Sequence, residues 1–219
     1  MGWANKLIGW TNNTGAEVNA EGALYTVSID PSGTHYAVAA KTGIIGATAA
    51  AGAAVFAMRL DPAAGSKRAW IDSIRLRWTT IVAFTTPITA TRSIVITRGN
   101  GAAASGGTAI PAATKKDTTY GASEFDSSLG GDMRVSTTGA LTITGITFET
   151  INFGEMTLIH SGTAGSYYET VYELSVRNHP IELSAGELLA VRVGTTAMDA
   201  AGTWVLGVEV NWREATTEG

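Results

Sequence analysis

The sequence predicts a nearly all-β protein, an antiparallel β-sandwich of jelly-roll type, and two observations support this. Many short stretches alternate apolar and polar residues with a period of two, as strands with one buried face do. Residues that favour turns, mainly Gly, Pro, Asn and Asp, separate these stretches, and a long amphipathic helix pattern does not occur. An up-and-down barrel is the alternative, because strand order cannot be read from the sequence.

Length and composition fit a single large β domain. The chain has 219 residues, of which 45% are hydrophobic and 16% are charged, so it is long and apolar enough to bury a core. It has no cysteine, which excludes disulfides, thiolate nucleophiles and sulfur-ligated metals. Its 19 acidic and 15 basic residues are spread along the chain. Without a block of like charge, neither nucleic acid nor an anionic membrane is the expected partner.

Residues 1–22 are expected to form an N-terminal arm that precedes a single sandwich domain at residues 23–219. The arm contains four large apolar side chains, Trp3, Leu7, Ile8 and Trp10. A short segment with two Trp residues either folds back over its own domain or docks on another protein. Because large aromatic side chains dominate interface energetics, we expect these four residues to bind a partner.

Neither export nor a membrane anchor is expected. The first residues, Met-Gly-Trp-Ala-Asn-Lys, lack the charged, apolar and small-residue regions of a standard signal peptide. The most apolar tract, Gly43 to Met58, is short and built mainly from Ala and Gly. A membrane-spanning helix needs about 20 strongly apolar residues, so this tract does not qualify.

The first half of the chain has several expected strands, at residues 24–29, 55–60, 74–78 and 92–98. The clearest alternates Ile74, Leu76 and Trp78 with Arg75 and Arg77, so one face is buried and the other carries guanidinium groups. Arg is enriched at protein interfaces, and we therefore expect Arg75 and Arg77 to contact a partner. The alternative is a solvated sheet face with salt bridges.

A long segment rich in Gly, Ala, Thr and Ser covers residues 99–131 and is expected to be a functional loop. Further strands are expected after it, at residues 140–144, 156–160, 169–175, 180–183, 188–193 and 203–213. The last has the strongest alternation, with one face formed by Trp204, Leu206, Val208, Val210 and Trp212.

No set of residues in the sequence predicts catalysis, a metal site or a cofactor. His35, His160 and His179 lack the spacing that places two imidazoles on one metal ion. The strained Gly-x-Ser-x-Gly turn of a serine nucleophile is missing, and most Asp residues lie in expected turns, where their side chains cap the backbone. We therefore expect a protein that is not an enzyme and that works through protein contacts.

Three stretches, Lys41–Gly46, Val55–Arg59 and Gly202–Arg213, resemble structural proteins of tailed-bacteriophage virions. Among these, the chain is most similar to head decoration (cement) proteins. The resemblance implies a β-sandwich that is made in the host cytoplasm, sits on the capsid surface as a trimer and binds the major capsid protein or other virion proteins. No functional residue is transferred individually.

Two alternatives stay open. A tail or fibre position would make the chain a receptor-binding or carbohydrate-binding module. A glycan-active sandwich enzyme or lectin, with carboxylates gathered from separate loops, is the other.

Overall fold

The computed structural model of the chain describes residues 16–18, 24–26, 33–46, 49–85, 91–159, 162–173, 180–199 and 201–216. The chain divides into two compact units, Met1–Gly33 and Thr34–Gly219, whereas the boundary predicted from the sequence follows residue 22. In the first unit, β1 (Ala16–Val18) pairs with β2 (Leu24–Thr26) in antiparallel fashion. The second unit is hereafter called the body.

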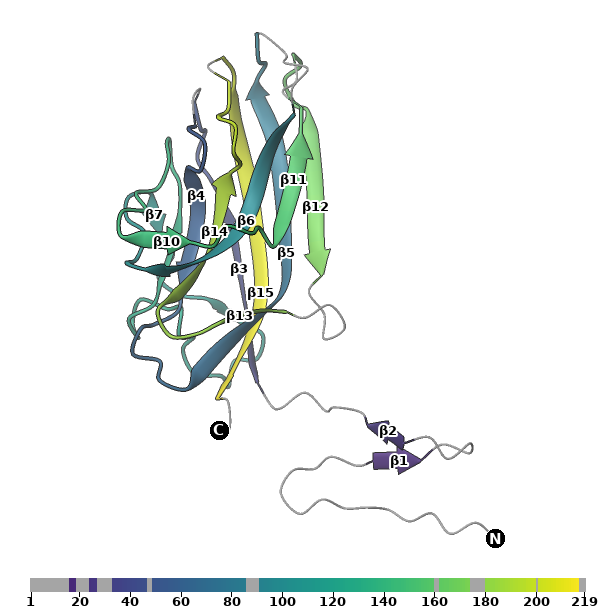
Figure 1. The fold of residues 1–219 in the computed structure, drawn as a ribbon, viewed down its shortest axis with the longest axis vertical. Coiled ribbons are helices and arrows are strands. Elements are labelled where there is room, and N and C mark those ends of the chain that lie inside the picture. Colours follow the sequence, from purple (N-terminus) through teal and green to yellow (C-terminus); the bar gives the residue numbers. More distant parts are fainter. Residues whose placement is uncertain are drawn as a thin grey trace. The chain divides into compact units, whose positions relative to one another are not determined.

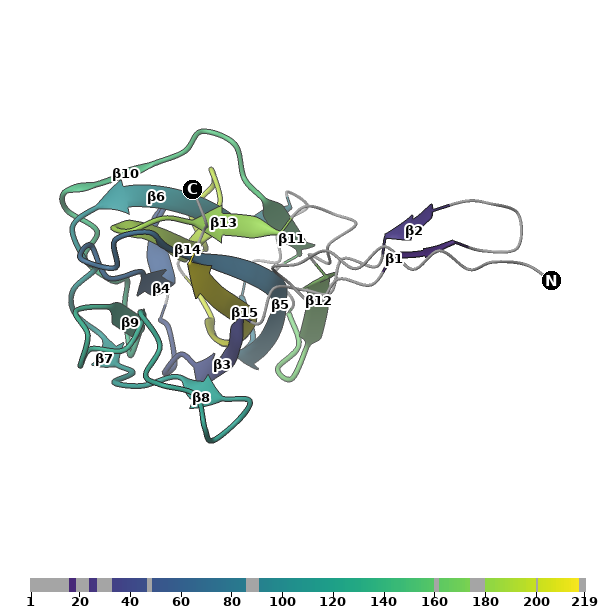
Figure 2. The same cartoon turned by 90° about the horizontal axis from the view of Figure 1, so that it is seen from below.

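The described part of the body contains two antiparallel sheets and no helix, which confirms the predicted all-β sandwich (Figures 1 and 2). The seven-stranded sheet runs in the order β10 (Ile146–Phe148), β6 (Arg92–Gly101), β14 (Glu187–Val193), β4 (Ala54–Arg59), β9 (Asp132–Val135), β7 (Thr108–Ala109), and β11 (Gly154–Leu158) also pairs with β6. The six-stranded sheet runs in the order β12 (Tyr167–Glu173), β5 (Lys67–Val82), β15 (Thr203–Thr216), β3 (Thr34–Lys41), β8 (Thr114–Lys115), and β13 (Ile181–Leu183) also pairs with β5.

The eight principal strands pair in a nested order. The first, β3, pairs with the last, β15, and β4 pairs with β14. Further inward, β5 pairs with β12 and β6 pairs with β11. Two more contacts, β5 with β15 and β6 with β14, join these pairs side by side within each sheet. The chain therefore folds back on itself as one long antiparallel ribbon that is rolled into two layers.

The space between the sheets is filled by large side chains from the two longest strands. On β15, the residues predicted to share one face are all buried: Trp204, Leu206, Val208, Val210 and Trp212. On β5, Ile74, Leu76 and Trp78 are buried as predicted. The rings of Trp78 and Trp204 stack with centroids 4.2 Å apart, which links the two strands across their shared ladder.

A second, smaller core lies on the other side of the seven-stranded sheet. Small residues of the sheet, including Ala54, Ala57 and Ala190, pack with Ala104 and Leu141 from two overlying segments. Those segments connect to the sheet and to each other through the isolated bridges of Leu141 with Ala54 and of Thr142 with Ser105. The Ala-rich tract thus lets backbone approach the sheet closely.

The prediction of a strand at residues 140–144 is wrong. Leu141 and Thr142 pair with different segments, so these neighbouring residues form single bridges and not a ladder. Six strands of the described residues were not predicted from the sequence: β1, β3, β7, β8, β9 and β10.

The segment at residues 99–131 is subdivided by short strands. Its first residues complete β6, and β7 and β8 then join opposite sheets. Farther on, Ser123, Glu124, Phe125 and Asp126 are buried, with Phe125 edge-on to Trp212 at 5.2 Å. Much of this Gly-rich segment therefore belongs to the packed body.

Gly131 gives a test of that packing. A Cβ at this position would lie 2.3 Å from the carbonyl oxygen of Glu124 and 2.4 Å from the carbonyl carbon of Phe125. Backbone atoms cannot yield cheaply, so Gly131→Ala should lower the free energy of unfolding by about 1–3 kcal/mol. The matched control is Gly121→Ala, where no atom lies within 4 Å. Equal denaturation midpoints for the two variants would contradict the described packing.

Candidate functional site

The outer face of the six-stranded sheet, which points away from the core, carries a network of four charged side chains. Arg75 and Arg77 on β5 lie between Glu169 on β12 and Glu209 on β15. Each arginine Nε is 3.5 Å from a Glu169 oxygen, and Glu209 Oε2 is 3.5 Å from Arg75 and 3.6 Å from Arg77. These side chains are 33–45% exposed, so the network lies open to a neighbouring molecule.

Tyr167 completes this network at one side. Its hydroxyl donates a hydrogen bond to Glu169 Oε2. That hydrogen bond, followed by the charges of Arg77 and Arg75, lowers the pKa of Glu169, so its carboxylate is ionised. Arg75 and Arg77 thus form the salt bridges that were the alternative prediction, and their contact with a partner stays a prediction.

The register places these charges in rows across the sheet. Glu169, Arg77, Gly207 and Lys41 lie side by side on β12, β5, β15 and β3. Lys41 is exposed, and among the described residues no carboxylate lies within ion-pair distance of it. Glu209 lies in the next row, opposite Arg75. We call this set of five charged residues and Gly207 the charged face.

Apolar side chains adjoin the charged face at one end of the sheet. Four large ones are exposed there, Ile44, Ile81, Val82 and Tyr167. Tyr167 shares a row with Val205, Val82 pairs with Thr203, and Ile44 precedes Ile45, which bridges to Trp204. Ile44, Val82 and Tyr167 are each 54% exposed. We call this group the apolar end, because exposed apolar side chains that gather at one end of a sheet are typical of interaction sites.

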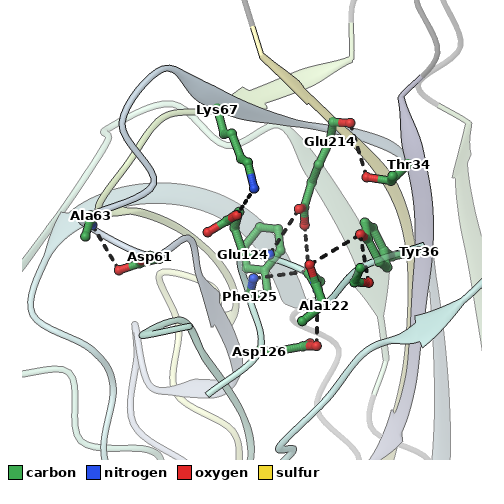
Figure 3. Close-up of polar contacts among 12 residues, drawn as sticks. Thr34, Tyr36, Asp61, Ala63, Lys67, Ala122, Glu124, Phe125, Asp126 and Glu214 are labelled. Carbon is green, nitrogen blue, oxygen red and sulfur yellow. Dashed lines mark hydrogen bonds and ion pairs between the residues drawn. The ribbon is translucent and has the colours of Figure 1, made fainter. Parts of the chain in front are cut away.

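A buried polar cluster lies around Glu214, toward the end of β15 (Figure 3). Glu214 Oε1 accepts hydrogen bonds from Ser123 Oγ at 2.6 Å and from Trp212 Nε1 at 2.9 Å. Its Oε2 accepts one from the backbone N–H of Glu124 at 3.0 Å. The carboxylate of Glu124 in turn forms an ion pair with Lys67. These contacts hold the 123–126 segment against β5 and β15.

A second set of contacts holds the neighbouring residues. Asp126 accepts hydrogen bonds from the backbone N–H groups of Ala113 at 2.7 Å and Ser123 at 3.1 Å. Tyr36 OH on β3 donates to the carbonyl oxygens of Gly121 and Ala122. The described partners of these carboxylates are groups of the chain itself, so the cluster acts as a structural clamp.

Burial raises the pKa of Glu214, although the hydrogen bonds from Ser123, Glu124 and Trp212 oppose this effect. Among the described residues, no group of three or more His, Asp or Glu side chains is arranged to hold a metal ion. His35 lies on β3, whereas His160 and His179 lie outside the described residues. The arm residues Trp3, Leu7, Ile8 and Trp10 lie outside them as well.

No known protein-family model matches the chain, and no curated protein matches it either. In the described part of the chain, no helix is long and apolar enough to cross a membrane.

Contacts were predicted from the sequence for Arg75 and Arg77, but no role was predicted for Lys41, Glu169 or Glu209. Glu169 and Glu209 lie on strands that were predicted, whereas Lys41 lies on β3, which was not. Only the register brings these residues together.

The clamp is tested by Glu214→Ala. This change leaves three buried donors without their acceptor, so we expect a loss of about 2–4 kcal/mol in the free energy of unfolding. The matched control is Glu209→Ala on the same strand, whose solvent-exposed ion pairs should contribute less than about 1 kcal/mol. Chemical denaturation measures both, and a cost for Glu214→Ala as small as the control's would disprove the clamp.

The raised pKa of Glu214 predicts how stability changes with pH. A carboxyl whose pKa is higher in the folded than in the unfolded state stabilises the fold when protonated, and this contribution is lost as the pH rises through the folded pKa. Glu214→Gln does not titrate. The stability of the wild type relative to Glu214→Gln should therefore decrease from about pH 4.3, the ordinary value, upward. Urea denaturation of both proteins across this range checks the sign, and a relative increase would refute the burial effect.

Proposed function

We propose that the chain is a non-enzymatic virion structural protein that binds the outer surface of a tailed-phage capsid and reinforces contacts between capsomers. The observation that carries the proposal is that the chain divides into a body and a separate N-terminal unit. The body, Thr34–Gly219, builds its own core, and Met1–Gly33 is a separate compact unit that contains Trp3 and Trp10. A stable body with a separate aromatic arm suits attachment to a larger assembly.

The strand order supports the proposal. We infer that the nested pairing of eight principal strands in two sheets is that of a jelly roll, the fold type of many viral capsid domains. Jelly rolls also occur in lectins, and one fold hosts many functions. The fold therefore supports a virion protein, in the capsid or in the tail.

Attachment of many copies provides the mechanism. An assembled lattice presents its binding sites in large number, so modest burial by each copy sums to a tougher shell. In this proposal the arm residues Trp3, Leu7, Ile8 and Trp10 supply the buried anchors, and the major capsid protein supplies the surface.

A tail or fibre position is the second candidate, and exposed aromatic side chains favour it. Phe153, just before β11, is 39% exposed and lies 5.5 Å from the guanidinium of Arg98, and Tyr167 is exposed as well. Aromatic rings of this kind are common where proteins bind receptors or sugars.

Copy number and arm deletion test the proposal together. In purified particles, quantitative mass spectrometry should find a copy number comparable to that of the major capsid protein, whereas a few copies would favour the tail. Deleting residues 1–12 should sharply lower particle occupancy and leave the denaturation midpoint of the body unchanged, because the arm and the body are separate units. Unchanged occupancy would overturn the role of the arm.

A further inference from the structure

We propose that two copies of the chain associate face to face through the outer surfaces of their six-stranded sheets, related by a two-fold axis parallel to the strands. This inference concerns self-association and does not depend on a capsid. It is carried by the charged face, the apolar end and the register that connects them.

The charges alternate across the sheet. Glu169 on β12 is negative, Arg75 and Arg77 on β5 are positive, Glu209 on β15 is negative and Lys41 on β3 is positive. A two-fold axis above the gap between β5 and β15 places β12 of one copy over β3 of the other, and β5 over β15. Each strand of the charged face then meets the opposite charge, Glu169 against Lys41 and Arg75 against Glu209.

Side-chain sizes are also complementary across the two-fold axis. In the row of Lys41, the operation places Arg77 over Gly207, whose missing side chain leaves room for the guanidinium. In the next row it places Val171 over Ala39. Large residues thus oppose small ones, as closely packed interfaces require.

The position of the apolar end is also compatible with this two-fold axis. Rotation about an axis parallel to the strands keeps position along the strand, so the apolar end of one copy meets that of the other. There Tyr167 approaches the region of Ile44, and Thr79 faces Val205. The exposed apolar side chains would become buried in a contact that is otherwise charged.

The size of the face sets the expected affinity. Four strands spaced about 4.8 Å apart, over seven residues at about 3.3 Å each, give a projected area of roughly 450 Å². This is about half of the ~800 Å² that each partner contributes to a standard interface. We therefore expect a reversible dimer that dissociates on dilution, and not an obligate one.

Lys41→Glu tests the proposal, using the full chain. It places two carboxylates opposite each other at both symmetry-related contacts, so the dimerisation constant should weaken at least about tenfold. Lys41 has no ion pair within the described part of its own chain, so folding should be unaffected, and circular dichroism verifies this. The matched control, Lys116→Glu, makes the same charge change on an exposed residue outside the charged face and should dimerise like the wild type.

Sedimentation equilibrium from about 1 μM to about 1 mM measures these constants. A monomer throughout, equal dimerisation of Lys41→Glu and wild type, or the trimer that resemblance to decoration proteins implies would each overturn the proposal. Because the chain lacks cysteine, Thr79→Cys introduces a unique thiol beside the axis. A bismaleimide of about 10 Å should link it into a covalent dimer, since packed sheets lie about 10 Å apart. Lys116→Cys should stay monomeric under the same conditions.

Discussion

The ladder between β5 and β15 is the contact on which the remainder of the body depends. These are the two longest strands, and they pair along nearly their whole length, from Thr203 with Val82 to Thr216 with Lys67. Their inward side chains include the stacked Trp78 and Trp204, which anchor the main core. Their outward side chains supply Arg75, Arg77 and Glu209 of the charged face, to which β12 adds Glu169 and β3 adds Lys41. One pairing therefore organises both the stability and the exposed chemistry of the sheet.

Two bulges on β5 leave the alternation of β15 unbroken. The ladder skips Ile81 between Thr203 and Trp204, and it skips Asp72 between Asn211 and Trp212. After the second shift, Trp212 still points into the core, where it contacts Tyr36 and Phe125. Glu214, two residues on, remains on the same side and reaches the clamp. Because the extra residue lies on β5, β15 keeps its alternation and supplies Trp212 to the core and Glu214 to the polar cluster from the same face.

The parts of the fold that follow from local pattern were predictable. Strand β15 and the middle of β5 show strict alternation, and their buried faces were predicted residue by residue. The strand β3 was not predicted because Ala37, Ala39 and Ala40 weaken the difference in polarity between its two faces. The segments around Ala104 and Leu141, which lie over the seven-stranded sheet, were not predicted because single bridges produce no periodic pattern in the sequence.

The charged face was only half visible in the sequence. Arg75 and Arg77 stand out because they alternate with apolar residues on one strand. Their partners Glu169 and Glu209 lie far along the chain, and only the pairing of β12 and β15 with β5 brings those carboxylates into reach. Sequence distance hid the network, just as it hid the clamp between Glu214 and the segment around Ser123.

The nested pairing also constrains how the body forms during synthesis. Thr34, at the start of β3, hydrogen-bonds to Glu214 across 180 positions of the chain. The outermost pair closes the largest loop, and topologies dominated by such distant contacts fold slowly. The sheet that holds β3 cannot be completed before the ribosome has made β15. Until then, β3 and β5 lack the long strand that pairs with both of them, and unpaired apolar strand edges of this kind favour aggregation.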